Sequence, residues 1–175
     1  MTVTDEQIRL TPSSYIVLGL LELAGEATPY ELKKIVGESV GHFWSLQHAQ
    51  LYSEPERLRA AGLVEERRER GGRRRRRYSL TDEGRMQLEQ WRSAPTSAFS
   101  ELRDPGLLQL YFGADPAALA ERQLAVHQEQ LDLYENLHES VKDSLPDGPR
   151  LALESGIGHE REWVRFWSRL VERDR

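Results

Sequence analysis

Apolar residues in the first part of the chain recur at helical spacing, and each stretch begins with a capping signal. Thr11-Pro12 sets a capping threonine before a proline at the first helical position, where the missing N–H removes no hydrogen bond. Thr28-Pro29-Tyr30-Glu31 repeats this signal and adds an acid three residues after the threonine, which completes a capping box. The sequence therefore predicts two helices, with inward-facing residues Ile16, Leu20 and Leu23 in the first and Leu32, Ile35 and Val36 in the second.

A third helix is predicted over Ser45–Ala61, because Leu51 and Leu58 stand one heptad apart. Pro55 interrupts this pattern, since a proline inside a helix removes a backbone hydrogen bond and clashes with the preceding turn. Read locally, Ser53-Glu54-Pro55-Glu56 is instead a capping box that starts a helix. We expect the helix to start near Ser45 and to be kinked or weakened at Pro55, with a start at Ser53 as the alternative.

The residues after Gly62, which marks the end of the third helix, predict a β-hairpin and a fourth helix. Leu63-Val64 leads into the first strand, and the two strands meet around Gly71-Gly72. The second strand alternates between two faces, with Tyr78 and Leu80 on one and Arg77 and Ser79 on the other. Thr81-Asp82-Glu83 then caps a helix that runs to about Trp91. This order of elements is typical of a winged helix-turn-helix.

The second half of the chain carries a longer helical pattern. Asp115-Pro116 caps a helix in which apolar and histidine residues keep an unbroken 4-3 spacing from residue 120 to residue 145. Pro146-Asp147-Gly148-Pro149 predicts a turn, and a last helix follows with an apolar face of its own. Two such helices packed antiparallel leave apolar surface for a second subunit. The residues expected at the subunit contact are Leu124, Leu131, Tyr134, Leu137, Val141, Trp163 and Trp167.

Composition places the chain among globular proteins, and its charge distribution indicates an anionic partner. The 175 residues are 38% hydrophobic and 30% charged, which suits one ordinary domain or two small ones. The net charge of -5 hides an asymmetry, because residues 1–95 hold 15 Lys and Arg against 14 Asp and Glu, whereas residues 96–175 hold 9 against 15. Eight arginines lie between Arg67 and Arg77, with Glu69 as the one acid among them. Such local density matters more to a polyanion than the net charge does.

Three stretches of the sequence resemble the PadR family of bacterial transcriptional regulators. Two of them are similar to the DNA-binding domain of this family: SYIVLGLLELAGEATPYEL and FWSLQHAQLYSEPERLRAAGLVEERRERGGRRRRRYSLTDEGR. The third, ELRDPGLLQLYFGADPAAL, resembles the start of the helical C-terminal domain in the longer, virulence-activator-like subfamily. Two positions depart from the family, Ala49 where it often has glycine and Pro55 where many members have leucine. The resemblance implies a mainly α fold: an α+β winged helix-turn-helix DNA-binding domain in residues 1–95, followed by an α-helical dimerisation and effector domain in residues 96–175.

This resemblance implies a sequence-specific regulator of double-stranded DNA, more often a repressor than an activator, which binds a palindromic operator as a homodimer. In such a module the polar N-terminal residues of the recognition helix meet base edges, a role that Gln47, His48 and Gln50 fit. Tyr52 can offer its hydroxyl to a phosphate, although a half-buried ring between helix and wing is equally consistent with its position. The arginine-rich hairpin follows the phosphate backbone or enters the minor groove. The expected DNA-binding residues are Ser45, Gln47, His48, Gln50, Tyr52, Arg70, Arg73, Arg74, Arg75 and Arg77.

Several other classes of protein are not expected. The longest apolar run, Ile16 to Leu21, is far shorter than the roughly 18 residues that a membrane span needs. The polar start MTVTDEQIRL does not resemble a secretory signal, so we expect a cytoplasmic protein without a membrane partner. The absence of cysteine excludes thiolate metal sites and cysteine nucleophiles. Because Glu135-Asn136-Leu137-His138 is a single Glu-x-x-His motif, and a di-iron bundle needs two, we expect no catalysis, metal or cofactor.

A second hypothesis treats the winged helix only as a scaffold. The protein would then be a small-molecule effector-binding or protein-interaction module, with a small aromatic effector held by tryptophans. The candidates for such a site are Trp91, Trp163 and Trp167. Neutralising Arg73 to Arg77 separates the two hypotheses, because this change should abolish operator binding under the first and leave partner binding intact under the second.

Overall fold

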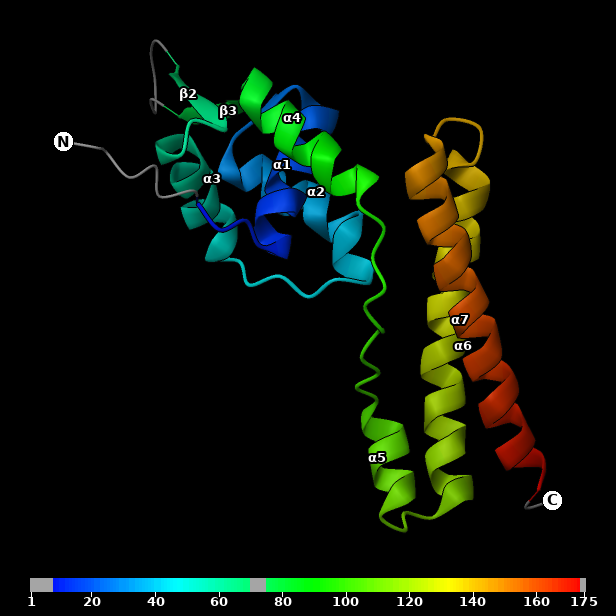
Figure 1. Ribbon diagram of the computed structural model, residues 1–175. Helices are drawn as coiled ribbons and strands as arrows, with labels where there is room; N and C mark the ends of the chain where they lie inside the picture. Colours follow the sequence, from blue (N-terminus) through cyan, green and yellow to red (C-terminus); the bar gives the residue numbers. More distant parts are fainter. Residues whose placement is uncertain (1–7, 70–74, 174–175) are drawn as a thin grey trace. The chain divides into compact units, whose positions relative to one another are not determined.

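The computed structural model describes residues 8–69 and 75–173, and the chain divides into two compact units, residues 1–98 and 99–175 (Figure 1). The first unit contains α1 (Pro12–Ala24), β1 (Glu26–Ala27), α2 (Pro29–Gly37), the 3-10 helix η1 (Val40–His42), α3 (Gln50–Ala60), β2 (Val64–Arg68), β3 (Arg76–Leu80) and α4 (Asp82–Ser93). The second contains α5 (Pro105–Tyr111), α6 (Pro116–Val141) and α7 (Asp147–Glu172).

The first two helices begin where their capping signals predict. α1 starts directly after Thr11, whose N–H donates to Ser14 Oγ at 2.8 Å. α2 starts directly after Thr28, and the capping box is complete: the Thr28 N–H donates to Glu31 Oε2 at 2.7 Å, and the Glu31 N–H donates to Thr28 Oγ1 at 3.2 Å. The predicted burial of Leu23 was wrong, because its side chain is 66% exposed. The buried apolar residues of α1 are Val17, Leu18, Leu20 and Leu21.

β2 and β3 form the predicted hairpin, and a third strand that the sequence analysis missed extends it. β1 pairs antiparallel with β3, which gives the strand order β1-β3-β2. Tyr78 and Leu80 are buried on one face of β3, and Arg77 and Ser79 lie on the other, as predicted. The turn predicted around Gly71-Gly72 lies outside the described residues.

The third helix starts at Gln50, so both predicted starts, Ser45 and Ser53, were wrong. A turn leads into it, in which the Gln50 N–H donates to the Gln47 carbonyl at 2.9 Å. Ser53 does not act as a cap, because its hydroxyl donates to the Ala49 carbonyl at 3.2 Å, one turn back in the helix. α3 is therefore shorter than expected, and residues 45–49 form the loop and turn before it.

α3 continues through Pro55, whose ring is fully buried. The proline removes one backbone hydrogen bond, and the apolar surface that it buries offsets part of that loss. Leu51 and Leu58, predicted to face inward, are both completely buried. They join a core made by residues of α1, α2, the sheet and α4, among them Leu18, Leu21, Leu32, Val64 and Leu88.

α4 begins after its predicted cap, Thr81, and lies close against the turn that follows α3. Thr81 Oγ1 accepts from the Gly84 N–H at 3.1 Å and donates to the Gly62 carbonyl at 2.8 Å. Gly62 has φ +75°, a conformation that favours glycine, and it ends α3 as predicted. A Cβ added at Gly84 would lie 2.1 Å from the Leu63 carbonyl oxygen.

Replacing Gly84 by alanine is expected to destabilise the protein by about 1–3 kcal/mol, because the Leu63 backbone or the start of α4 must move to admit the methyl group. Urea unfolding followed by circular dichroism measures this change. Gly19→Ala is the matched control, since Gly19 is also helical and an added Cβ meets nothing within 4 Å. Equal unfolding free energies for the two variants would contradict the close approach of α4 to Leu63.

In the second unit α6 and α7 run antiparallel side by side, and α5 precedes them (Figure 1). α6 begins after its predicted cap Asp115, whose Oδ1 accepts from the Ala117 N–H at 3.2 Å. The predicted turn at residues 146–149 was misplaced: α7 already starts at Asp147, and residues 142–145 form the turn. A buried cluster of Leu131, Tyr134 and Ile157 joins the two long helices.

Candidate nucleic-acid interface

The polar residues predicted to read bases are accessible in the first unit. The Tyr52 side chain is 51% exposed, which is consistent with both predictions for this residue, a phosphate contact and a half-buried ring. Gln50 and Tyr52 lie in the first turn of α3 and are exposed, whereas Leu51 between them is buried. Three of the predicted DNA-binding residues lie on the loop and turn before the helix and are exposed: Ser45, Gln47 and His48.

Gln50 already makes one contact that bears on recognition. Its Oε1 accepts from the Gln47 N–H at 3.3 Å, which closes the turn before α3. α3 has no side-chain cap, since its N-cap residue is Ala49. This contact uses one of the two lone pairs of Oε1, so the second lone pair and the carboxamide N–H groups of Gln50 remain for partners other than the described residues.

The arginine run divides into two groups in the structure. Three of the predicted DNA ligands, Arg70, Arg73 and Arg74, lie outside the described residues. Arg75 is exposed, and its guanidinium makes no ion pair with any described residue. The arginines on the hairpin strands, in contrast, all contact carboxylates of the same unit: Arg67, Arg68, Arg76 and Arg77.

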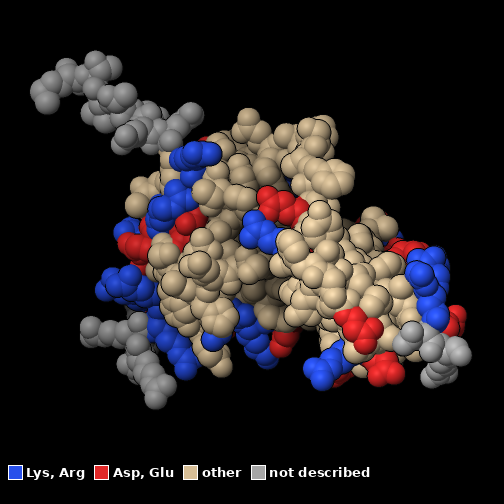
Figure 2. Space-filling model, turned by 90° about the horizontal axis from the view of Figure 1, so that it is seen from below, with Lys and Arg blue, Asp and Glu red and all other residues tan. Residues whose placement is uncertain are grey.

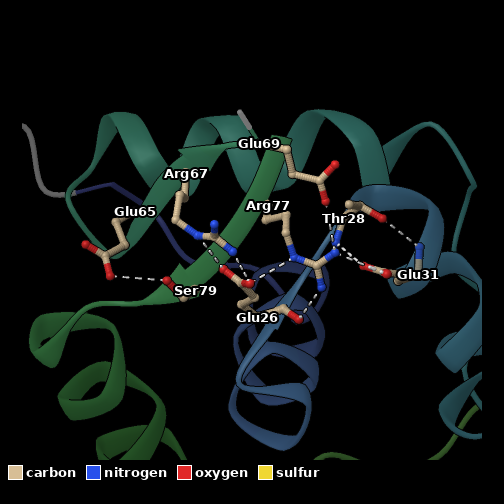
Figure 3. A network of polar contacts seen from close by, with 8 residues as sticks. All are labelled: Glu26, Thr28, Glu31, Glu65, Arg67, Glu69, Arg77 and Ser79. Atoms are coloured by element: carbon tan, nitrogen blue, oxygen red, sulfur yellow. Dashed lines mark hydrogen bonds and ion pairs between the residues drawn. The ribbon is translucent and has the colours of Figure 1, made fainter. Parts of the chain in front are cut away.

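Arg77 lies on the face of the sheet that points away from the core, where it contacts three carboxylates (Figure 3). Its Nε donates to Glu26 Oε1 at 3.0 Å, its Nη1 donates to Glu31 Oε1 at 3.3 Å, and Nη1 lies 3.6 Å from Glu69 Oε1. Its Nη2 donates to the Glu26 carbonyl at 3.3 Å. The Arg77 side chain is only 20% exposed. Glu26 also accepts from Arg67, so one carboxylate joins both strands of the hairpin.

These contacts shift the pKa values of the acids. Hydrogen bonds from Arg67 hold the pKa of Glu26 below its ordinary value of 4.5, and the charges of Arg67 and Arg77 add to this effect. The pKa of Glu31 is lowered first by the Thr28 N–H and further by Arg77. Both acids are therefore ionised at neutral pH and compensate the positive charge at the base of the hairpin.

A second set of contacts, on the opposite face of the hairpin, joins it to the recognition helix. Arg76 Nη1 lies 3.6 Å from Glu56 Oε2 and 3.7 Å from Glu66 Oε2, and the Tyr78 hydroxyl donates to Glu56 Oε2 at 3.4 Å. Glu56 belongs to α3, where it also accepts from Arg59 at 2.7 Å. Hydrogen bonds from Arg59 lower the pKa of Glu56.

α3 also contacts the start of α1 through polar side chains. Arg57 Nη2 donates to Glu54 Oε1 at 2.5 Å and to Ser14 Oγ at 2.8 Å. Burial alone would raise the pKa of Glu54, but hydrogen bonds from Arg57 and Ser14, together with the charge of Arg57, lower it. Ser14 is completely buried and Glu54 is 8% exposed, so this contact lies at the edge of the core.

The lowered pKa values predict a loss of stability in acid. A carboxyl group whose pKa is lower in the folded state stabilises the fold fully above its ordinary value of 4.5, and this contribution disappears as the pH falls through the folded-state pKa. Urea unfolding between pH 7 and pH 3 should therefore show a decline below about 4.5, the ordinary pKa. The decline should be shallower for Glu26→Gln, which removes one of these groups. A variant that declines as steeply as the wild type would contradict the assignment.

Basic and acidic side chains are interspersed on the face drawn in Figure 2. Each of the four strand arginines forms an ion pair with a glutamate of the same unit. These glutamates offset the charge of the arginine-rich segment, so the first unit is not strongly basic. Sequence reasoning missed Glu26, Glu31 and Glu56 as parts of this region. The alternation of β2 and β3 places Glu69, Arg67 and Arg77 on one face, but no local signal brings Glu26 beside them.

The residues predicted at the subunit contact occupy two environments in the second unit. Leu131, Tyr134 and Trp167 are buried between helices of the same chain. Those that remain half-buried are Leu124, Leu137, Val141 and Trp163. The exposed large apolar side chains of α6 and α7, among the described residues, are Val126, Leu133 and Leu151.

The tryptophans considered as an effector site lie in different surroundings. Trp91 stacks on Tyr15 in the first unit, with ring centroids 4.7 Å apart. Trp163 stacks on His127, with centroids 5.5 Å apart, and the His127 Nδ1 lies 2.6 Å from Glu160 Oε2. The three tryptophans therefore do not form one cluster within either unit.

Within residues 8–69 and 75–173, no group of three or more potential metal-binding side chains comes together. No helix in the same ranges is long and apolar enough to cross a membrane.

Comparisons with known proteins agree with the architecture. Residues 17–90 match the transcriptional regulator PadR-like family, and residues 102–173 match the virulence activator alpha C-term family. The negative transcriptional regulator PadR of Bacillus subtilis strain 168 is 31% identical over 167 residues, which cover 87% of this chain and 91% of that protein.

Two solved structures extend the likeness to the fold. PadR of Bacillus subtilis in complex with operator DNA has a TM-score of 0.83 and 24% identity, over 94% of this chain and 98% of that one. PadR of the same organism in complex with p-coumaric acid has a TM-score of 0.77 and 27% identity, over 93% and 98%. The expected fold class, a mainly α protein with an α+β winged helix-turn-helix and a helical C-terminal part, is confirmed.

Proposed function

Because the chain belongs to the PadR-like family of transcriptional regulators, we propose that it binds a specific DNA operator as a homodimer and represses transcription. The observation that supports this best is the combination of an exposed, polar N-terminal turn on α3 with a hairpin whose Arg75 forms no ion pair with a described residue. The turn offers donors and acceptors to base edges, and the hairpin offers positive charge to phosphates.

In this proposal the start of α3 enters the major groove. Gln50, Gln47 and His48 contact base edges, because they lie at and just before the N-terminus of the helix. Ser45 and Tyr52 contact phosphates, which fix the position of the helix without reading sequence. Arg75 and the neighbouring Arg70, Arg73 and Arg74 supply the charge of the hairpin.

The second unit is proposed to form the dimer. α6 and α7 leave Val126, Leu133 and Leu151 exposed, and a second copy can cover them. A two-fold dimer presents two recognition helices, so the operator should be an inverted repeat with half-sites about 34–36 Å apart.

Repression and a cytoplasmic location are parts of the same proposal. The relative from Bacillus subtilis is named a negative regulator, which supports repression here. A regulator of this kind acts in the cytoplasm, where the chromosome lies.

A small aromatic effector is the second candidate function, because PadR of Bacillus subtilis has been crystallised with p-coumaric acid. Such a compound would release the operator by favouring a DNA-free conformation. Titration of p-coumaric acid against tryptophan fluorescence, with and without operator, tests this proposal. Unchanged fluorescence and unchanged DNA affinity at millimolar acid would reject this compound.

Selection of bound duplexes from a random pool tests the main proposal. The wild-type chain should enrich an inverted repeat, and the double variant Gln47→Ala/Gln50→Ala should lose that enrichment while still binding DNA weakly through its charge. Thr96→Ala is the control, because Thr96 lies outside both α3 and the hairpin. A pool that stays random after selection by the wild type would refute the proposed function.

A further inference from the structure

The donors of Arg77 are already engaged within the protein. Three nitrogens of its guanidinium donate to Glu26, Glu31 and the Glu26 carbonyl, at 3.0 to 3.3 Å (Figure 3). The side chain is 20% exposed, whereas that of Arg67, its cross-strand partner, is 62% exposed. A phosphate would have to displace carboxylates before it could bind Arg77.

The acids that hold Arg77 are themselves fixed to the rest of the first unit. Glu31 closes the capping box of α2 through the Thr28 N–H at 2.7 Å. Glu26 belongs to β1, where it pairs with Ser79 in the sheet. The network of Glu26, Glu31, Arg67, Glu69 and Arg77 therefore links β1, the start of α2, β2 and β3; we call it the hairpin brace.

The brace adds to the support that the core gives the hairpin. β2 and β3 are five residues each, and β1 adds only two. Val64, Tyr78 and Leu80 hold one face of the strands in the core, and the brace holds the other face through Arg67 and Arg77. Arg75 lies one residue before β3, so the brace sets where this arginine points relative to α3.

Resting on the proposed operator binding, we propose that Arg77 is a positioning residue rather than a phosphate ligand, and that Glu26 promotes DNA binding through it. The brace holds the hairpin at the angle at which Arg75 and the recognition helix reach the same duplex. The affinity for DNA is then higher, because the hairpin is already ordered before binding and no binding free energy is lost in ordering it.

This role reverses the effect expected from charge alone. Removing a carboxylate near a polyanion should strengthen binding, since it removes repulsion. If Glu26 positions Arg77, its neutralisation should weaken binding instead. Arg77→Lys also distinguishes a phosphate ligand from a positioning residue, because lysine keeps the charge for a phosphate but cannot reproduce the planar guanidinium that donates to two carboxylates and a carbonyl.

The experiment compares Glu26→Gln and Arg77→Lys with Glu65→Gln in the full chain. Glu65 lies on the same face of the hairpin and accepts from Ser79 at 3.2 Å, but it makes no ion pair with a described residue (Figure 3). Affinity for the inverted repeat enriched by the wild type is measured by fluorescence anisotropy. Hydrogen exchange of the β2 and β3 amides is measured on the same samples, and circular dichroism shows that each variant is folded.

Glu26→Gln and Arg77→Lys are each expected to bind about three- to tenfold more weakly, the range for loss of a partly exposed charged hydrogen bond. The hairpin amides of both should exchange faster, while Glu65→Gln should bind at least as tightly as the wild type. The double variant should be no weaker than the weaker single variant, because both changes break one network.

Two results would overturn the inference while leaving the proposed function intact. One is a Glu26→Gln variant that binds as tightly as Glu65→Gln or more tightly, and the other is a weakened variant whose hairpin exchange is unchanged. If Glu26→Gln fails to fold, Arg77→Lys decides alone, and wild-type affinity would then refute positioning. A wild type that enriches no sequence would remove the proposed function and this inference together.

Discussion

Operator affinity is expected to fall by about 10³ to 10⁵ as salt rises from 50 to 200 mM, because a dimer with two hairpins neutralises about six to ten phosphates and releases their counterions. Arg75 should account for part of this dependence, since it is exposed and its guanidinium is free of carboxylate partners among the described residues. The slope of log affinity against log salt, measured by anisotropy, gives the number of phosphates neutralised.

Arg75→Gln provides the internal comparison. It should lower the magnitude of the salt slope by about one for each subunit, and it should weaken binding to specific and random duplexes alike. The Gln47→Ala/Gln50→Ala variant should instead keep the slope and lose the preference for the inverted repeat. An affinity that hardly changes between 50 and 200 mM would contradict a phosphate-binding hairpin.

The parts of the fold that were predicted correctly depend on local signals. Thr28, Thr81 and Asp115 each precede the first residue of a helix, because their side chains accept from free N–H groups of the first turn. Thr11 also precedes a helix, and there the Thr11 N–H donates to Ser14 Oγ. Gly62 ends α3 because its φ of +75° suits glycine. The alternation of Arg77, Tyr78, Ser79 and Leu80 follows from the geometry of a strand in the same way.

The start of the recognition helix could not be predicted by such signals. Ser45 and Ser53 are both plausible caps, yet α3 starts at Gln50 with alanine at the N-cap position. The turn before it is closed by the Gln50 side chain, and Leu51, Pro55 and Leu58 set its register by their burial in the core. Tertiary packing therefore decided this boundary, and it moved Gln47 and His48 off the helix.

The ion pairs of the strand arginines were missed for a related reason. A run of like charges predicts a contact with an anion, but it does not show which anion. Glu26 is 41 residues from Arg67 and 51 from Arg77, and only the pairing of β1 with β3 brings them together. Four of the eight arginines thus form ion pairs with acids of their own unit. The proposed contact with DNA therefore depends on the other four, which are Arg70, Arg73, Arg74 and Arg75.

The second unit has a small core, which makes its stability depend on few side chains. Its buried apolar residues, among those that the structure describes, are Ala120, Leu131, Tyr134, Ile157 and Trp167. Trp167 is completely buried and lies against Phe166, with ring centroids 4.8 Å apart and planes at 75°. A pair of helices cannot enclose such a core by itself, so apolar surface that remains exposed favours association with a second copy.

Trp167→Ala is therefore expected to cost about 3–5 kcal/mol of unfolding free energy, the range for removal of a buried tryptophan. Because the proposed dimer needs a folded pair of helices, sedimentation velocity should show loss of this dimer, and operator affinity should fall with it. Trp167→Phe is the matched control: it keeps a ring and removes an indole N–H that has no hydrogen-bond partner among the described residues. This variant should stay dimeric. A Trp167→Ala protein with wild-type stability and assembly would show that the paired helices do not depend on this residue, and that the dimer is held elsewhere.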